Sequence, residues 1–421
     1  MLHGAPSIPN RFQETARDLA SVFAARAAEW DRTRAYCWSN VQELADAGLM
    51  GMTIPEEFGG KGASYHDVVL VIEEIAKACT LSARIVVEAN MGGVSAVMAY
   101  GTEAQKQLSA ALVLKGDKPA ICITEPEAGS AATEMKTTAR RVAGGYRLDG
   151  TKHWITGGGV SKLHVVFARV LNDAGEDEGI GAFILVRDPD RGVEPEGFRI
   201  LGREHTLGLC GMPEAELHFE DVLVEDAMVL TPPSGFRRGF ADLMDAYNSQ
   251  RVGAGTVAMG VAAGALDHAK RHLKERHQFG RPIAEFQGLQ WMLADMDAKV
   301  HASRLMLREA ALSRGPNGSP FPNMMMAARA KAFASEAAIK VVSDALQIFG
   351  ARGYGDKEPI ERMYRDVRMF TIGGGTAQVL KTQVAGSLLG IRTPQTRDGY
   401  ARLAVQAQSG DASVAMPDDA S

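Results

Sequence analysis

The sequence predicts an N-terminal helical domain, a middle antiparallel β-domain and a C-terminal helical bundle. Three observations predict this order. Helical patterning broken by Pro and Gly clusters runs from about Phe12 to Lys118. Short apolar runs between turn residues follow, from about Ile121 to Leu230, as in strands. Long segments with helical periodicity then return. We place the domains at residues 1–119, 120–232 and 233–392, with a loose C-terminal tail at 393–421.

Each part has local signals for its elements. In the first part, the stretch from Pro55 to Gly62 must be a loop, and Thr102 is placed to cap a helix. In the second, the runs 165–168 and 182–186 read as strands. Three turns are expected there, at Gly144-Gly145, Asp149-Gly150 and Asp173-Ala174-Gly175.

The third part is predicted to contain long helices joined by short loops. One apolar stripe has helical spacing and consists of Leu289, Met292, Leu293, Met296 and Val300. A loop at residues 315–320 separates this helix from another that ends near Phe349-Gly350. Long helices with short connections favour a bundle.

Composition excludes several classes of protein. The 421 residues include 46 Lys+Arg and 51 Asp+Glu, a net charge of −5 that argues against nucleic-acid binding. No apolar run reaches the length of a membrane helix, and the N-terminus resembles no secretory signal. The cysteines lack disulfide or metal spacing. We therefore expect a cytoplasmic protein without a metal or a membrane partner; the four cysteines are Cys37, Cys79, Cys122 and Cys210.

Several segments are candidates for binding a phosphorylated or planar ligand. The loop Ile121–Ser130 follows a strand, and Lys152–Gly159 sets Trp154 beside a Thr-Gly-Gly turn. The segment Arg276–Ile283 ends a helix with an Arg suited to pyrophosphate, although it also reads as an ordinary helix C-terminus. The last candidates are two Gly-rich segments, Gln347–Gly355 and Ile372–Gln378; the second opens a helix whose N-terminus suits an anion.

Taken together, these segments resemble the acyl-CoA dehydrogenase family. The ordered motifs are T-E-P-x-A-G-S, W-I-T-G, R-x-x-F-G, Q-x-x-G-x-x-G-Y and R-D-x-R-x-x-x-I-x-x-G-T, and the resemblance covers about residues 12–391. It implies a C-terminal four-helix bundle, an acyl-CoA thioester substrate and FAD bound between subunits of a homotetramer.

The resemblance also implies site residues. The flavin ring is expected against residues 121–130 and Trp154-Ile155-Thr156, and the substrate against Ser130, Arg251, Gly374 and Gly375. The remaining FAD contacts are expected from two groups, the second donated by a neighbouring subunit. The implied cofactor residues are Ile121, Cys122, Ile123, Thr124, Gly129, Ser130, Trp154, Ile155, Thr156, Arg276, Gln278, Phe286, Gln287, Thr376 and Gln378, and from the neighbour Gln347, Ile348, Phe349, Gly350 and Ala351.

The chain departs from the family where the catalytic base belongs. Members remove an α-proton with a Glu, but one usual position is Gly374 here and the other is Gln250. An amide is not a useful base. Another carboxylate could serve instead, for instance Asp242, Asp245 or Glu361. Two further departures are Ala131, where Asp is usual, and Ala351, where Gly is usual.

Arg84 supplies a further clue about the substrate. In members that accept dicarboxylic acyl-CoAs, an arginine from this region pairs with the distal acid group. The alternative is that Arg84 bridges Glu88 at i+4 on an exposed helix face. Its apolar neighbours make an unpaired guanidinium there costly, so both interpretations stay open.

This chain combines Arg84 with the lack of a carboxylate base and with Gln250 in the place of that base. The combination resembles the branch of the family that converts 3-sulfinopropionyl-CoA to propionyl-CoA and sulfite. Its implied catalytic residues are Arg84, which holds the sulfinate, and Gln250, which orients the water that supplies oxygen to sulfur. The flavin would lie against the β-carbon. Two alternatives are an acyl-CoA dehydrogenase or reductase with an unrecognised base, and a non-catalytic FAD- and CoA-binding subunit.

Overall fold

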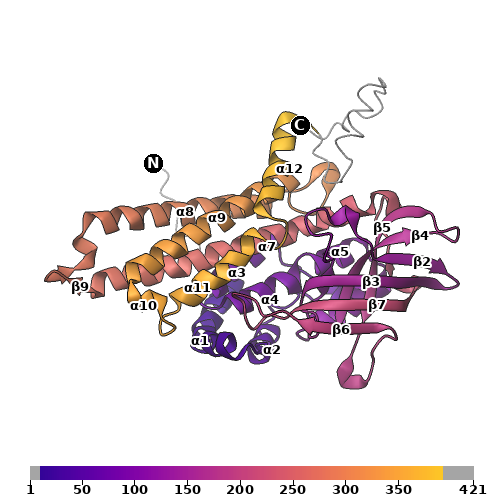
Figure 1. Cartoon of the computed structure of the whole chain (residues 1–421), viewed down its shortest axis with the longest axis horizontal. Helices are drawn as coiled ribbons and strands as arrows, with labels where there is room; N and C mark the ends of the chain where they lie inside the picture. Colours follow the sequence, from indigo (N-terminus) through magenta and orange to yellow (C-terminus); the bar gives the residue numbers. More distant parts are fainter. Residues whose placement is uncertain (1–9, 392–421) are drawn as a thin grey trace.

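The computed structural model describes residues 10–391. Long helices extend to one side of the molecule and the β-sheet lies at the other, with the N-terminal helices beneath them (Figure 1). The helical, β and helical order expected from the sequence is therefore confirmed. The predicted tail at 393–421 lies outside the described residues.

Between residues 10 and 119, the N-terminal part contains six α-helices. Thr102 caps the last of them through a capping box with Gln105, as predicted. The segment from Pro55 to Gly62 is a loop with one short 3₁₀ turn, also as predicted. The helices are α1 (Arg11–Thr33), α2 (Trp38–Asp46), α3 (Tyr65–Ala76), α4 (Thr80–Asn90), α5 (Gly93–Tyr100) and α6 (Glu103–Val113).

The middle part is an eight-stranded sheet in the order β6-β7-β3-β2-β4-β5-β8, with β1 paired to β4. Most pairs are antiparallel, but β1–β4 and β2–β4 are parallel. The predicted strands at 165–168 and 182–186 lie in β4 and β5. The strands are β1 (Ala120–Cys122), β2 (Thr138–Val142), β3 (Gly145–Thr156), β4 (Leu163–Leu171), β5 (Asp177–Val186), β6 (Phe198–Arg203), β7 (Glu214–Glu225) and β8 (Val229–Leu230).

The turn predicted at Asp149-Gly150 is wrong, because β3 runs straight through it. The pairing of β3 with β7 slips between Leu148 and Gly150, so the Asp-Gly pair forms a bulge instead. Gly150 has a φ of +146°, and a Cβ there would lie 2.6 Å from the Thr137 hydroxyl. The glycine therefore serves close packing rather than chain reversal.

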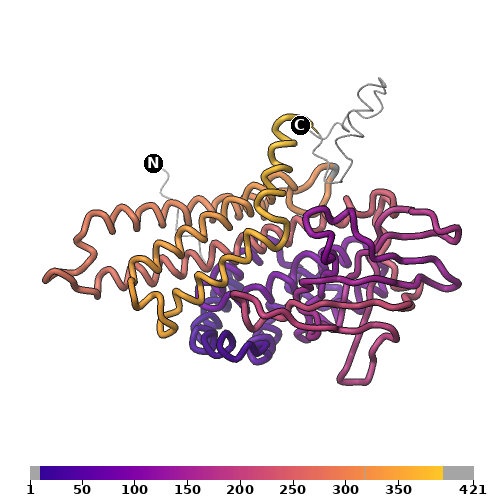
Figure 2. Tube along the Cα trace, in the orientation of Figure 1, coloured from indigo at the N-terminus to yellow at the C-terminus, as the bar shows by residue number. Residues whose placement is uncertain are grey.

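The C-terminal part is built on three long helices that lie side by side (Figure 2). The predicted stripe on α8 packs against the core, and α9 ends at Phe349 as expected. A small hairpin at the far end joins α7 to α8. The elements are α7 (Gly235–Glu275), β9 (His277–Gln278), β10 (Arg281–Pro282), α8 (Gln287–Leu312), α9 (Met324–Phe349), α10 (Ala351–Tyr354), α11 (Ile360–Val367) and α12 (Ala377–Leu389).

One hydrophobic core joins the helices before the sheet to those after it. It includes Val87 of α4, Val257 of α7 and Val341 of α9, whereas the sheet encloses a separate cluster around Phe183 and Phe219. Helix α4 is buried along its whole length. The division into domains at residues 119 and 232 stays a prediction. Across residues 10–391, no helix is both long and apolar enough to cross a bilayer.

Candidate active site

A cluster of buried charges surrounds Arg84 on α4. The Arg84 guanidinium lies 2.9 Å from a Glu88 carboxylate oxygen, one turn further along the helix. The other oxygen of Glu88 pairs with Lys118, which precedes β1. The expected i+4 bridge therefore exists, but it is buried rather than exposed: the Arg84 and Glu88 side chains are 7% and 4% accessible.

This cluster continues into the W-I-T-G turn. The Lys118 ammonium donates to the Thr156 carbonyl at 3.4 Å. The Thr156 hydroxyl lies 2.9 Å from each carboxylate oxygen of Glu214, the first residue of β7. One continuous polar network thus connects residues of α4, the segment before β1, β3 and β7. It links Arg84 to the segment expected to contact the flavin.

Around Arg84 itself, two cations face one carboxylate. Arg84 and Lys118 share the single carboxylate of Glu88, and within the described residues the Arg84 Nε–H has no hydrogen-bond partner. Burial is the largest single influence and lowers the pKa of Arg84, but the negative charges of Glu88, Tyr247 and Glu214 and the hydrogen bond to Glu88 together outweigh it, so the pKa is raised overall. A buried, charged guanidinium with an unused donor suits an anionic group of a ligand.

The two predicted residues Gln250 and Arg251 lie in the buried middle of α7. A Cβ on Gly92 would lie 2.6 Å from the Gln250 Oε1 and 2.8 Å from the Ile121 side chain, so this amide faces the α4–α5 turn and β1. Its Oε1 accepts no hydrogen bond from the described residues. Arg251 donates to Asn248 at 2.7 Å, while its Nε–H is also without a partner there. Both side chains keep capacity for a ligand or water.

The Gly-rich loop at 373–375 comes close to α7. Lys331 of α9 is fully buried and donates to the carbonyls of Gly373 and Gly375, at 2.9 and 2.6 Å. Burial, together with the charges of Arg251 and Arg84, lowers the pKa of Lys331 to about 7. A Cβ at Gly374 would approach only Ala254 and Lys331, both at 4.0 Å.

The backbone conformation at position 374 favours glycine over the glutamate that is usual in the family. Gly374 has a φ of +73°, a left-handed conformation that strains any other residue, although there is room for a side chain. Its N–H has no acceptor among the described residues. The N–H is therefore free for the predicted hydrogen bond to a thioester carbonyl.

The three alternative carboxylates are held elsewhere. Asp242 accepts from the Ser234 N–H and hydroxyl, and Asp245 accepts from Ser319 at 2.9 Å. Glu361 pairs with Arg365 on the same helix. Each therefore has a structural partner, and the buried charge cluster contains Glu88 and Glu214 instead.

The two predicted flavin segments lie next to each other, because the His153 N–H donates to the Thr124 carbonyl at 2.9 Å. Trp154 has a φ of +53° and is 51% exposed, and its ring stacks on His153. The side chains of Cys122 and Ile155 point into the sheet core, so only their backbones can meet a cofactor. The other predicted members of these segments are partly or fully exposed: Ile121, Ile123, Thr124, Gly129, Ser130 and Thr156.

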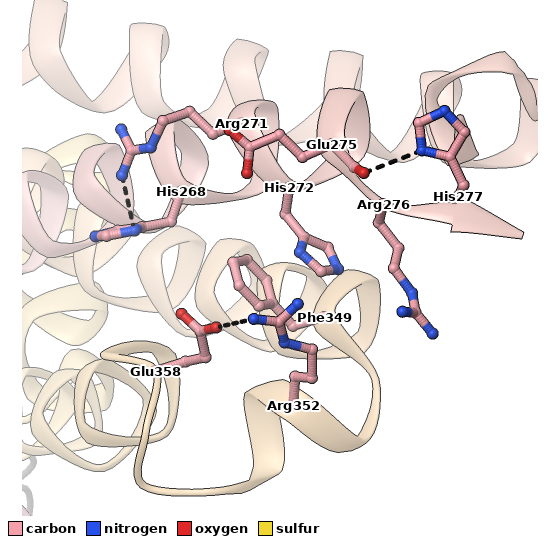
Figure 3. A pocket seen from close by; sticks show the side chains of 9 residues that line it. All are labelled: His268, Arg271, His272, Glu275, Arg276, His277, Phe349, Arg352 and Glu358. Carbon is pink, nitrogen blue, oxygen red and sulfur yellow. Dashed lines mark hydrogen bonds and ion pairs between the residues drawn. The ribbon is translucent and has the colours of Figure 1, made fainter. Parts of the chain in front are cut away.

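The R-x-x-F-G segment forms a tight hairpin at the end of α7. Arg276 closes the helix and, with Phe349 of α9, lines a cavity of about 350 Å³ (Figure 3). Gln278 lies in β9, the Arg281 guanidinium covers the Phe286 ring, and Gln287 opens α8. The cavity is rich in cationic and imidazole groups: His268, Arg271, His272, Arg276, His277 and Arg352, against Glu275 and Glu358.

The Q-x-x-G segment reaches the same end of the bundle. Gln347 and Ile348 belong to the last turn of α9, and Gly350 turns the chain with a φ of +59°. Ala351 begins α10 with helical geometry, so the departure from the usual Gly costs nothing there. A single chain already places Phe349 beside Arg276; donation of residues 347–351 to a neighbouring subunit's cofactor stays a prediction.

Thr376 and Gln378 open the last helix. The helix predicted to begin after the Gly-rich segment is α12, and the Thr376 hydroxyl caps it by accepting from the Val379 N–H. Their cofactor contacts stay a prediction.

Sequence reasoning missed three polar residues of the central site: Glu214, Lys118 and Lys331. Lys331 had a visible signal, because it interrupts an Ala-rich helix face that must be buried. Glu214 and Lys118 had none, since acidic and basic residues beside turns are ordinary surface features. Residues 10–391 contain no group of His, Cys, Asp and Glu arranged for a metal.

Comparison with known proteins connects this site to a family. Family models for acyl-CoA dehydrogenase match the N-terminal domain at residues 9–117, the middle domain at 120–222 and the C-terminal domain at 237–389. A relative from Cupriavidus necator, named 3-sulfinopropanoyl-CoA desulfinase, is 58% identical over 389 residues, covering 92% of this chain and 96% of its own. One of the same name from Variovorax paradoxus is 57% identical over 94% of this chain and 97% of its own.

The fold has the same relatives among solved structures. Butyryl-CoA dehydrogenase from Megasphaera elsdenii superposes with a TM-score of 0.84 at 31% identity, covering 92% of this chain and all of that one. Apart from Lys118, every residue of the candidate site falls within the three family-model matches. The chain belongs to the acyl-CoA dehydrogenase family.

Proposed function

We propose that the protein desulfinates 3-sulfinopropionyl-CoA to propionyl-CoA and sulfite. The observation that carries the proposal is the buried, positively charged Arg84 cluster combined with the absence of a carboxylate at Gln250 and Gly374. Such a site suits an acyl group with an anionic end and lacks the usual means of removing its α-proton. Two relatives at 57–58% identity bear the name of this activity.

FAD is the cofactor that these residues fit. Arg271, Arg276 and Arg352 gather around the cavity at the bundle end, where a pyrophosphate needs cationic donors. The exposed ring of Trp154 offers a wall for a planar ring system. When bound, FAD supplies a flat, electron-accepting surface beside the acyl chain.

The reaction itself is hydrolytic and needs no external oxidant. The carbon–sulfur bond breaks, the β-carbon gains a proton, and sulfur gains the oxygen of water. Arg84 holds the sulfinate with charge-assisted hydrogen bonds. The Gly374 N–H binds the thioester carbonyl, and Lys331 fixes that loop through its two carbonyl contacts. Gln250, whose Oε1 is otherwise unused, orients the water.

The protein is proposed to act as a homotetramer in the cytoplasm. Large apolar side chains on the C-terminal helices are exposed in the single chain, and a second copy would cover them. This exposure supports self-association. These side chains include Trp291, Leu305 and Leu312 of α8, Phe333 of α9, and Leu388 and Leu389 of α12.

A second candidate is an acyl-CoA dehydrogenase, and one observation favours it. Glu214 is a half-buried carboxylate in the polar network, and burial raises its pKa to about 7. A carboxyl with such a pKa is suited to accept a proton near neutral pH. This candidate predicts that a simple acyl-CoA reduces the flavin.

One experiment separates the two candidates. The purified yellow protein is mixed with 3-sulfinopropionyl-CoA or with butyryl-CoA, while sulfite and the flavin spectrum are followed. We expect sulfite from the first thioester and no bleaching by the second. Bleaching by butyryl-CoA without sulfite from the other thioester would establish the dehydrogenase and refute the desulfinase.

A further inference from the structure

Glu214 occupies a place between the candidate substrate site and the flavin wall. It follows Pro213 and begins β7, and both of its carboxylate oxygens lie 2.9 Å from the Thr156 hydroxyl. The residue sits deep among protein atoms yet keeps accessible surface. A deep carboxyl with accessible surface faces an opening, so it can meet a ligand.

Charged and titratable groups face Glu214 from every packed element. On the adjoining strand segment, Glu204 pairs with Glu214 through the backbone but directs its own carboxylate to His153. The groups whose charge or hydrogen bond acts on Glu214 are Arg84 and Glu88 of α4, Lys118 before β1, Thr156 of β3, Arg203 of β6 and Tyr247 of α7.

These surroundings leave the carboxyl close to the midpoint of its titration. The pKa of Glu214 is raised to about 7, with burial as the largest cause; the Arg84 charge, the Thr156 hydrogen bond and the Lys118 charge oppose this rise, and the Glu88 charge adds to it. A second anion placed at Arg84 would add a like charge, which favours the protonated form further. The same anion would bind poorly beside an ionised Glu214.

We propose that Glu214 determines substrate specificity: its protonated carboxyl joins Arg84 in binding an acid group at the end of the acyl chain. This deepens the proposed function and rests on it. The Thr156 hydroxyl donates to one carboxyl oxygen, which leaves the acid O–H of the other free to donate to the ligand. Ionisation removes this donor and adds repulsion.

The proposal predicts how affinity depends on pH. An anionic acyl-CoA binds the protonated site, so its affinity falls about tenfold per pH unit above the pKa of Glu214. Between pH 6 and pH 8.5 we expect a loss of about 30-fold. An uncharged acyl group has no such preference, and its affinity stays level.

The experiment measures the dissociation constants of succinyl-CoA and butyryl-CoA for the FAD-loaded protein from pH 6 to 8.5. Succinyl-CoA carries a carboxylate where the sulfinate would lie, and butyryl-CoA is its uncharged control of similar length. The variant Glu214→Gln mimics the neutral acid. At pH 6 this variant should bind succinyl-CoA as tightly as the wild type does, and its dissociation constant should stay constant up to pH 8.5.

Several results would overturn the proposal. A dissociation constant of succinyl-CoA that does not change with pH in the wild type would overturn it, and this test needs no variant, so it holds even if Glu214→Gln fails to fold. The proposal would also fail if Glu214→Gln kept the pH dependence of the wild type. It would fail as well if butyryl-CoA bleached the flavin of the wild type but not that of Glu214→Gln, since Glu214 would then be a catalytic base. Sulfite release is measured separately, so the proposed function can fail while the binding profile stands.

Discussion

The two ends of the candidate site are built in opposite ways. The acyl end, around Arg84, Glu88 and Lys118, is buried and its charges pair within one chain. The cavity at the end of α7 is open, and Arg276 there is exposed and has no carboxylate partner among the described residues. Figure 3 shows Arg276 extending away from the helix that carries it.

This difference agrees with what each end is proposed to bind. A small anionic acyl end needs a fixed, water-poor receptor, because hydrogen bonds to charged groups are strongest away from water. A pyrophosphate carries more charge and tolerates a wetter site with several cations. The buried end should therefore lose much from a single substitution, and the open end little.

The largest effect is expected for Glu88→Gln. It leaves Arg84 and Lys118 buried together without their shared carboxylate, so the free energy of unfolding should fall by about 3–4 kcal/mol. Urea unfolding measures this change. The matched control is Glu220→Gln, which removes the exposed partner of Arg199 and should cost less than about 1 kcal/mol. If both variants lost the same free energy of unfolding, the buried pairs of Glu88 would contribute no more to stability than an exposed ion pair.

The next effect is expected for Arg84→Lys. An ammonium keeps the charge but loses the planar fork, so kcat/KM for sulfite release should fall by about 100-fold. Arg17→Lys, which changes an exposed arginine paired with the buried Glu74, serves as the control and should leave turnover unchanged. Wild-type kinetics in Arg84→Lys would remove Arg84 from the mechanism.

The smallest effect is expected for Arg276→Gln at the open end. Arg271 and Arg352 remain beside the cavity, so FAD affinity should weaken only about tenfold. Absorbance of the flavin per protein, titrated with added FAD, reports the affinity. Lys270→Gln, on the same helix but outside the cavity, should retain wild-type affinity. An equal loss in both variants would assign the effect to general surface charge.

Much of the fold could be predicted from local signals. Helical periodicity on α8, the Thr102 cap and the loop from Pro55 to Gly62 depend on residues close in sequence, and all three are confirmed. The Asp149-Gly150 turn was wrong because a bulge and a turn use the same residues. Only the partner strand β7 distinguishes them.

For the site, local sequence already contains the motifs, the missing base at Gly374 and Gln250, and the unusual position of Arg84 in an apolar helix. Which charges meet depends on how the chain folds. Glu214 lies 130 residues after Arg84 (214 − 84), yet hydrogen bonds through Thr156 and Lys118 connect it to the network and the Arg84 charge acts on it directly. Long-range pairing of this kind depends on packing, which no local pattern encodes.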